Sequence, residues 1–292
     1  MLKVLVTGAT GFTGSHVVPA LLKNGLDVRC FLRKSSDTGH LPVSDIDLAV
    51  GDLDDKPSLQ RALEGVDILV NVASIGFGHA PAIVKAAEAA GLKRAVFIST
   101  TAIFTQLDAD SKSVRLAAEE TITNSSLDYT IIRPTMIYGS SRDRNICRLI
   151  RYVKRYPAIP VFGDGTFLQQ PIYVADLADA IVKVLPAKAA FGRAYNVAGA
   201  QPLTFNALID TVAALMGKKI GKIHLPAGPI VKILRFFERQ AIRFPISSEQ
   251  VLRLNENKAF DYTAAVQDFG FTSRLFSEGL QLELESMGML SA

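Results

Sequence analysis

Three glycines recur at intervals of three residues near the start of the chain, in the sequence Thr7-Gly8-Ala9-Thr10-Gly11-Phe12-Thr13-Gly14. The motif follows an apolar run typical of a strand and precedes an amphipathic run typical of a helix. Glycines at these spacings allow a tight turn, close approach of the backbone to a pyrophosphate, and close packing of helix on strand. The phosphates would lie at the positive end of the helix dipole. We therefore predict a dinucleotide site with contacts from Gly8, Thr10, Gly11, Phe12, Thr13 and Gly14.

The residues after the second predicted strand bear on which dinucleotide is bound. Sites for NAD tend to place a carboxylate there, to accept hydrogen bonds from the ribose hydroxyls. This chain has Arg33 and Lys34, followed by two serines. Cations and hydroxyls suit a 2′-phosphate, so we expect NADP(H) to be preferred, with NAD(H) possible. The alternative is that these residues form a solvated loop.

Other predicted strand ends supply further candidate contacts with the cofactor. Asp52 closes the third strand and could accept a hydrogen bond from an adenine amino group. Ala73 and Ser74 close the fourth strand and would flank the adenosine. The predicted cofactor site also includes Leu53, Ser99, Arg115 and Pro134.

The elements that must position these residues alternate along the first two thirds of the chain. Short β-branched runs are separated by amphipathic stretches of about helical length, and Gly25, Gly65 and Gly91 stand where helices should end. This alternation predicts βαβ units. We therefore expect an α/β fold with a doubly wound parallel sheet that is buried on both faces.

The texture of the sequence changes after Tyr138 and again after residue 198. We predict a nucleotide-binding domain from residues 1–138 and 171–198. Residues 139–170 and 199–292 would form a smaller, mostly helical substrate-binding lobe. The glycine-rich segment 161–167 is expected to form a hairpin.

Composition excludes several classes of protein. The 292 residues are 49% hydrophobic, with 32 Lys and Arg against 28 Asp and Glu, so the chain can bury a core and is only mildly basic. Its two cysteines and isolated histidines predict neither a disulfide framework nor a metal site. We find no nucleic-acid-binding signature, no secretory leader and no run that could span a membrane, and we expect a cytoplasmic protein.

The basic, amphipathic segment 230–244 has three possible roles. It could lie on an anionic membrane, dock on a partner, or close the smaller lobe over a substrate cleft. We favour the last role and expect no peripheral membrane contact.

Six motifs occur together in a familiar order. They are TGATGFTG (7–14), GDLDD (51–55), VNVAS (70–74), FISTT (97–101), IIRPTMIYG (131–139) and QQPIYVADLADAI (169–181). In this order, the chain resembles the extended or atypical short-chain dehydrogenase/reductases, which include nucleotide-sugar epimerases and dehydratases. The resemblance implies a Rossmann fold that binds NAD(P), a small-molecule substrate and an active site built on a Ser/Thr and a Tyr-x-x-x-Lys pair.

The resemblance also implies roles for individual residues. It places Thr100 at the Ser/Thr position, Ser111 at the position of the Tyr and Arg115 at that of the Lys. An alkyl hydroxyl is far less acidic than a phenol, and a guanidinium does not release its proton. Arg115 could still bind ribose hydroxyls, but another group would have to move the proton. Candidates are Tyr138, Lys112, the substrate itself or water.

A second departure concerns the substrate. Epimerases of this family often carry an Arg before the strand PIYV, where this chain has Gln169 and Gln170. In this respect the chain looks closer to atypical members, including an accessory subunit of respiratory complex I whose nucleotide is structural. Two hypotheses follow. The first is an oxidoreductase, epimerase or dehydratase acting on a nucleotide sugar or another small carbonyl or hydroxyl compound, and the second is a non-catalytic NAD(P)-binding sensor or assembly protein. The sequence makes no prediction of the oligomeric state.

Overall fold

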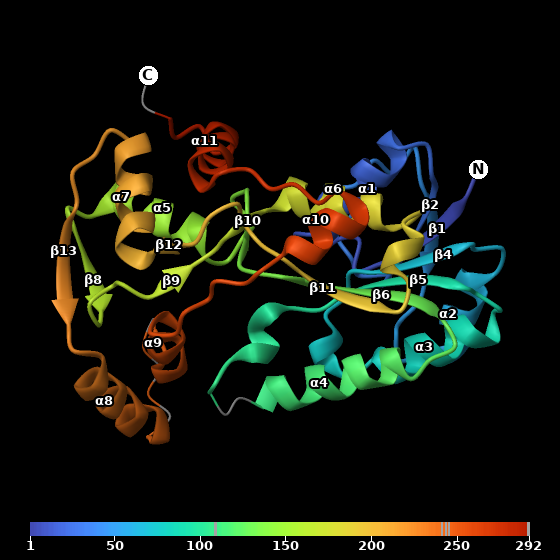
Figure 1. The fold of residues 1–292 in the computed structure, drawn as a ribbon, viewed down its shortest axis with the longest axis horizontal. Coiled ribbons are helices and arrows are strands. Elements are labelled where there is room, and N and C mark those ends of the chain that lie inside the picture. The colour runs from blue at the N-terminus through green and yellow to red at the C-terminus, as the bar shows by residue number, and fades with distance from the viewer. Residues whose placement is uncertain (108–109, 241, 243, 245, 291–292) are drawn as a thin grey trace.

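The computed structural model describes residues 1–107, 110–240, 242, 244 and 246–290 (Figure 1). Seven strands form one sheet in the order β11-β6-β5-β4-β1-β2-β3, and each neighbouring pair is parallel. They are β1 (Lys3–Thr7), β2 (Asp27–Leu32), β3 (Asp47–Val50), β4 (Ile68–Asn71), β5 (Arg94–Ile98), β6 (Asp128–Pro134) and β11 (Arg193–Val197). The order reverses at β1, which confirms the doubly wound sheet predicted from the sequence.

Helices cover both faces of this sheet. On one face lie α1 (Gly14–Lys23) and α6 (Val174–Val184), which pack on each other. On the other lie α2 (Lys56–Leu63), α3 (Ala80–Ala89) and α4 (Asp110–Thr123). Successive strand side chains point to opposite faces, so Val4 and Val6 join the first core and Leu5 joins the second. The near-continuous apolar strands of the sequence follow from this double burial.

The smaller lobe is built from segments on both sides of α6. Its strand pairs are β7 (Ile137–Tyr138) with β10 (Ile172–Tyr173), β8 (Ala158–Phe162) with β13 (Gly221–Leu225), and β9 (Leu168–Gln169) with β12 (Leu203–Thr204). Its helices are α5 (Ile146–Arg155), α7 (Phe205–Leu215), α8 (Ala227–Arg239), α9 (Ser248–Leu254) and α11 (Phe276–Ser286). Short 3-10 turns are η1 (Ile75–Phe77), η2 (Thr101–Phe104) and η3 (Lys188–Ala190). The hairpin expected at 161–167 is wrong, because β8 pairs in parallel with the distant β13.

One helix of the C-terminal segment packs with the larger domain. Although the sequence assigned residues 199–292 to the smaller lobe, α10 (Thr263–Phe269) contacts α6 and β11. Its residues Ala265 and Phe269 belong to the core that covers one face of the seven-stranded sheet. The chain therefore returns to the larger domain before it ends in α11, as Figure 1 shows.

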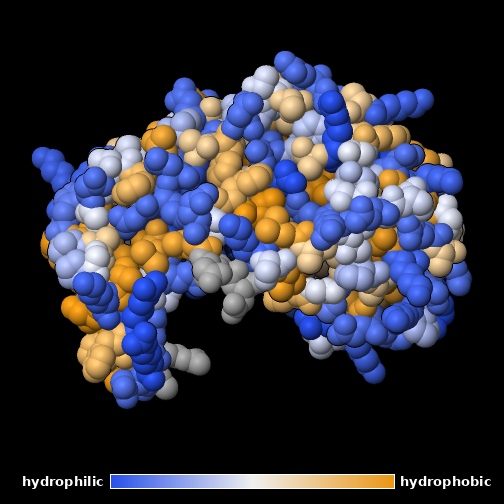
Figure 2. Space-filling model, turned by 60° about the horizontal axis from the view of Figure 1, so that its bottom comes forward, coloured by the Kyte–Doolittle hydropathy of each residue, from blue (hydrophilic) through white to orange (hydrophobic). Residues whose placement is uncertain are grey.

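Figure 2 shows a hollow between the projection that contains α8 and the body of the molecule.

Among the helices in the described part of the chain, none is long and apolar enough to cross a bilayer.

Candidate functional site

The glycine-rich turn joins β1 to α1 where the strand order reverses. Gly8 has φ +69°, a conformation that glycine adopts without strain, and a Cβ there would lie 2.5 Å from the backbone nitrogen of Ala73. A Cβ on Gly14 would collide with the carbonyl oxygen of Gly8. Two of the three glycines are therefore required by close backbone contacts, as the spacing predicted.

Gly11, unlike Gly8 and Gly14, has few atoms close to the position that a side chain would occupy. A Cβ there would meet only the Gly8 carbonyl oxygen, at 3.2 Å, so the space in front of Gly11 is open. The Gly11 N–H donates to Gly8 and the Ser15 N–H to Gly11, both at 3.0 Å. These bonds close the turn directly before α1 begins, and the absence of a side chain at Gly11 leaves the space beside the turn open. This geometry fits the pyrophosphate of a dinucleotide.

A buried polar pair supports the turn from below, and sequence reasoning missed it. The Thr7 hydroxyl donates to Asn71 Oδ1 at 2.6 Å, and the Asn71 amide donates to the Ala73 carbonyl at 3.0 Å. Both side chains are buried. The pair joins the ends of β1 and β4, the neighbouring strands at which the strand order reverses. The sequence does contain a sign of this pair, because Asn71 is the single polar residue of the otherwise apolar strand β4.

The other predicted cofactor contacts follow the carboxyl ends of neighbouring parallel strands. Arg33 and Lys34 follow β2 and are exposed, and Asp52 and Leu53 follow β3. Ala73 and Ser74 follow β4, Ser99 follows β5, and Pro134 ends β6. Parallel strands end at one edge of the sheet, so these residues lie along that edge, which is where such folds bind ligands.

Several of these side chains are already engaged. The Asp52 carboxylate accepts from the Asp54 N–H, and the Ser74 hydroxyl accepts from the Gly76 N–H. Ser99 donates its hydroxyl to Glu119 of α4, and Arg133 of β6 pairs with the same carboxylate. Ser99 thus fixes α4 against the sheet, and by doing so it positions Ser111 and Arg115.

Thr100 begins η2 at the edge of the site. Its Oγ1 accepts from the Ala102 N–H at 3.1 Å. A hydroxyl can accept and donate at the same time, so Thr100 keeps a hydrogen that it can offer to a substrate oxygen. Its side chain is neither fully buried nor fully exposed.

Ser111 and Arg115 lie one turn apart on α4 and contact each other. Arg115 Nη1 donates to Ser111 Oγ at 3.0 Å. A Cβ on Gly76 would lie 3.1 Å from Arg115 Nε, so the guanidinium lies across the turn after β4. Burial and the neighbouring Arg253 lower the pKa of Arg115, and Glu249 opposes them. Helix α4 therefore brings together Ser111 and Arg115, the two residues that the resemblance assigns to the positions of the Tyr and the Lys.

Tyr138 lies in the core of the smaller lobe, which corrects its assignment as a proton donor. Its side chain is 1% exposed and packs against Tyr173 and Phe276. Its hydroxyl donates to the Phe276 carbonyl oxygen at 3.2 Å, and burial raises its pKa. A buried phenol that is committed to a backbone carbonyl is not available to a substrate in the cleft.

The side chains of Gln169 and Gln170 point inward and hydrogen-bond to backbone groups that are distant in the sequence. Gln170 Nε2 donates to the Gly199 carbonyl and its Oε1 accepts from the Phe260 N–H, both at 2.8 Å. Gln169 Nε2 donates to the Glu256 carbonyl at 3.3 Å. Both side chains are buried, so they tie the segment after α9 to β9.

This segment, residues 255–260, meets the turn that starts at Thr100. The Thr105 hydroxyl and the Gln106 N–H donate to the Glu256 carboxylate, and Phe260 packs on Phe104 with ring centroids 5.7 Å apart. Lys112, the first-turn lysine of α4, donates to the Thr105 carbonyl oxygen at 2.6 Å.

Lys258 belongs to the same segment and was not identified from the sequence. Its ammonium donates to the Arg253 carbonyl oxygen, and burial lowers its pKa to about 8.

Arg142 is a second missed residue, from the loop between β7 and α5. Its guanidinium donates to Ser15 Oγ at 3.0 Å and to the Thr10 carbonyl oxygen at 2.8 Å. The smaller lobe therefore contacts the glycine-rich turn directly. No local pattern marks this residue, because its partners are far away in the sequence.

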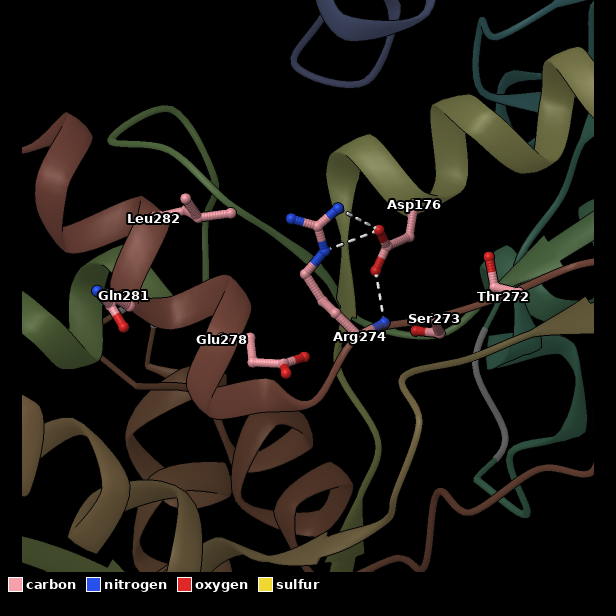
Figure 3. A pocket seen from close by; sticks show the side chains of 7 residues that line it. All are labelled: Asp176, Thr272, Ser273, Arg274, Glu278, Gln281 and Leu282. Carbon is pink, nitrogen blue, oxygen red and sulfur yellow. Dashed lines mark hydrogen bonds and ion pairs between the residues drawn. The ribbon is translucent and has the colours of Figure 1, made fainter.

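The site includes neither a cluster of metal ligands nor the pocket between α6 and α11, within the residues that the structure describes. Within the described residues, no group of three His, Cys, Asp or Glu side chains could hold a metal ion. A pocket of about 580 Å³ lies between α6 and α11, and none of its lining residues comes from the glycine-rich turn (Figure 3).

Comparison with known proteins agrees with this geometry. Residues 8–188 match a family model described as NAD(P)H-binding. The chain is 28% identical to the mitochondrial NADH dehydrogenase (ubiquinone) 1 alpha subcomplex subunit 9 of Arabidopsis thaliana, over 90% of this chain and 70% of that protein. It is 25% identical to the N-acetyl-alpha-D-glucosaminyl-diphospho-ditrans,octacis-undecaprenol 4-epimerase of Escherichia coli O157:H7, over 97% and 94% of the two chains.

A solved structure gives the same result for the fold. The UDP-glucuronic acid 4-epimerase of Bacillus cereus, in complex with UDP-glucuronic acid and NAD, superposes with a TM-score of 0.77 at 20% identity. The match covers 98% of this chain and 99% of the epimerase.

Proposed function

Because this chain belongs to the NAD(P)H-binding family and has the fold of the extended and atypical short-chain dehydrogenase/reductases, we propose that it is an NADP(H)-preferring oxidoreductase. Its substrate would be a small carbonyl or hydroxyl compound, including a nucleotide sugar. The observation that carries this proposal is the open space before Gly11, at the start of α1 and beside the switch point between β1 and β4. In such a site, the nicotinamide supplies or accepts a hydride.

The side chains around the turn divide the remaining tasks. Arg33 and Lys34 bind the 2′-phosphate, and Arg115 binds ribose hydroxyls from its place across the turn after β4. Thr100 orients a substrate oxygen by donating its hydroxyl hydrogen. Arg142 holds the glycine-rich turn against the smaller lobe.

We propose Lys258 as the candidate that moves the proton. Its lowered pKa, about 8, leaves both protonation states accessible near neutral pH. It belongs to the segment whose Glu256 and Phe260 contact the turn that begins at Thr100. Ser111, by contrast, has no acidity in this range.

The first experiment identifies the nucleotide. The purified protein is denatured and any released nucleotide is identified by mass spectrometry, and the emptied protein is titrated with NADPH and NADH. We expect NADPH to bind more tightly, and Arg33→Ala to weaken NADPH binding about tenfold, because it removes a charge-assisted phosphate contact. Arg61→Ala, which alters an exposed arginine on α2, serves as the control. Equal affinities would contradict the preference for NADP(H), and failure to bind either would remove the nucleotide site.

The second experiment tests turnover. The NADPH-loaded protein is incubated with carbonyl compounds, and the NADP⁺-loaded protein with hydroxyl compounds and nucleotide sugars, while the absorbance of the reduced nicotinamide is followed. We expect at least one carbonyl compound to oxidise NADPH or one hydroxyl compound to reduce NADP⁺, and Thr100→Ala to slow that reaction. A rate unchanged by Thr100→Ala would contradict the role given to this hydroxyl.

A specific observation favours a second candidate, a non-catalytic NAD(P)-binding sensor or assembly protein. Ser111 and Arg115 are bonded to each other where the family carries its Tyr and Lys, and Tyr138 is buried. The relative from Arabidopsis thaliana is itself named as a subunit of a larger enzyme. Tight nucleotide binding with no redox change for any compound would favour this candidate. A partner protein that binds the nucleotide-loaded form but not the empty form, or the reverse, would establish it.

A further inference from the structure

Helix α8 has one apolar face that the fold covers and a second that it leaves open. Val231 and Leu234 are buried against Val251 of α9. Ile233 and Phe236, on a different side of the helix, are 51% and 61% exposed. Phe237 extends this second stripe by ring contacts with Phe236 and with Phe244. We call Ile233, Phe236, Phe237 and Phe244 the open apolar stripe.

Positive charges border this stripe. Lys232, Arg235 and Arg239 follow the helical spacing along its edge, all three are exposed, and none forms a salt bridge with another described residue. The one acidic residue of the helix, Glu238, accepts from the backbone and the hydroxyl of Ser248. In Figure 2 hydrophobic and hydrophilic surface lie side by side on the projection that contains α8.

We propose that the open apolar stripe of α8 docks on an anionic lipid surface. A helix that lies in a membrane interface needs an apolar face of aromatic and aliphatic side chains bordered by Lys or Arg, and α8 has this arrangement. The three cations select negatively charged headgroups, which a neutral apolar groove of a partner protein would not require. This surface departs from the closing role that the sequence favoured, because the stripe points away from the α9 residues that α8 covers.

The position of α8 gives the docking a consequence. Its neighbour α9 carries Glu249 and Arg253, which act electrostatically on Arg115 of the candidate site. A membrane beneath α8 therefore lies one helix away from the candidate site. The docking itself does not depend on the proposed enzymatic function.

Vesicle sedimentation of the full-length protein tests the proposal. We expect the protein to pellet with vesicles of phosphatidylcholine and phosphatidylglycerol but not with phosphatidylcholine alone, and added salt to weaken the association. Arg235→Gln should weaken partitioning about fivefold, the factor that corresponds to ~1 kcal/mol for one basic residue. The double variant Ile233→Ser with Phe236→Ser should weaken it more than about tenfold.

The matched control is Val266→Ser, which alters an exposed apolar residue on α10 (44% exposed). All these positions are exposed, so the thermal midpoints should match that of the parent protein, which separates lost docking from lost folding. Equal binding to both kinds of vesicle, or variants that bind as the parent does, would overturn the proposal. So would self-association that the double variant abolishes without any vesicle binding, because the stripe would then bind a second copy of the chain.

Discussion

Individual side chains show how burial changes acid–base behaviour in this molecule. Glu283 of α11 is fully buried, and no hydrogen-bond donor among the described residues reaches its two oxygens. Burial, followed by contact with Asp143, raises its pKa to about 10, and Arg151 opposes the shift. Glu283 therefore keeps its proton at neutral pH and can donate it to Asp143. Lys258 is shifted in the opposite sense, because its charged form is the one that burial penalises.

Glu283 makes the stability of the protein depend on pH. Its folded pKa of about 10 lies above its ordinary value of 4.5, so the folded state binds the extra proton between these limits. The free energy of unfolding should fall by up to ~1.4 kcal/mol per pH unit as the pH rises through this window. Glu283→Gln should remove this slope, measured by urea unfolding between about pH 5 and 9. Glu285→Gln, which is exposed on the same helix, should leave it unchanged, and a slope that survives in Glu283→Gln would contradict the assignment.

Lys258 can be tested by a pair of substitutions. Lys258→Met should lower the turnover of an active substrate by roughly 10²- to 10⁴-fold, the usual contribution of a positioned acid or base, while leaving NADPH affinity unchanged. In the parent protein, the pH–rate profile should show a limb near the lowered pKa, about 8. Lys258→Arg keeps the positive charge and can still donate to the Arg253 carbonyl, but it cannot release a proton. Recovery of the rate in Lys258→Arg would mean that Lys258 only caps α9.

At the scale of elements, close backbone contacts at two glycines shape the turn between β1 and α1. Gly8 abuts the backbone at Ala73, and Gly14 abuts the carbonyl of Gly8. Because Gly8 and Gly14 have no side chain, β1, β4 and α1 pack closely. The space beside Gly11, in contrast, stays open. The strands could be predicted because a parallel sheet covered on both faces needs continuous apolar runs, and the helices because one apolar face recurs about every four residues.

Gly8→Ala should disrupt both the turn and the binding of nucleotide. A Cβ at Gly8 meets the Ala73 backbone at 2.5 Å in a left-handed conformation, so we expect a loss of more than about 2 kcal/mol of stability. The matched control is Gly25→Ala, since Gly25 has φ +74° but nothing within 4 Å of an added Cβ. It should lose only about 1 kcal/mol and bind NADPH normally. Urea unfolding and NADPH titration measure both effects; similar losses in the two variants would show that the contact with Ala73 is unimportant.

At the scale of the whole molecule, polar contacts join the larger domain to the smaller lobe. Arg142 joins the smaller lobe to the glycine-rich turn, and Glu256 joins it to Thr105. A third contact is the pair of Asp176, at the start of α6, with Arg274, just before α11 (Figure 3). Arg274 donates through its guanidinium and its backbone N–H, and its guanidinium also lies over the ring of Tyr173.

Asp176→Ala should destabilise the protein by about 3 kcal/mol, because it leaves the cation of Arg274 without its buried partner. Asp179→Ala provides the control on the same helix. Asp179 is 50% exposed and pairs with Lys183 at one turn's distance, an arrangement that contributes little. Thermal and urea unfolding should separate the two variants clearly. Equal stability would show that the Asp176–Arg274 pair does not hold the C-terminal segment.

The sequence by itself determined the parts of this protein that depend on neighbouring residues. The spacing of Gly8, Gly11 and Gly14 indicated a phosphate-binding turn, and the alternation of apolar runs indicated a doubly wound sheet. The sequence also predicts that Ser111 and Arg115 stand at the positions of the Tyr and the Lys, and their spacing of four residues places them on one face of a single helix.

Only the tertiary structure decided the contacts between residues that are distant in the sequence. Tyr138 looked like a residue at the end of a strand, but Phe276 of α11 packs on it and its carbonyl accepts the hydroxyl. Gln170 binds the backbone of Phe260, and Arg142 binds the backbone of Thr10. β8 pairs with β13, so the expected hairpin does not form. Local patterns record which face of an element is apolar, but the partner that covers this face is chosen when distant segments pack together.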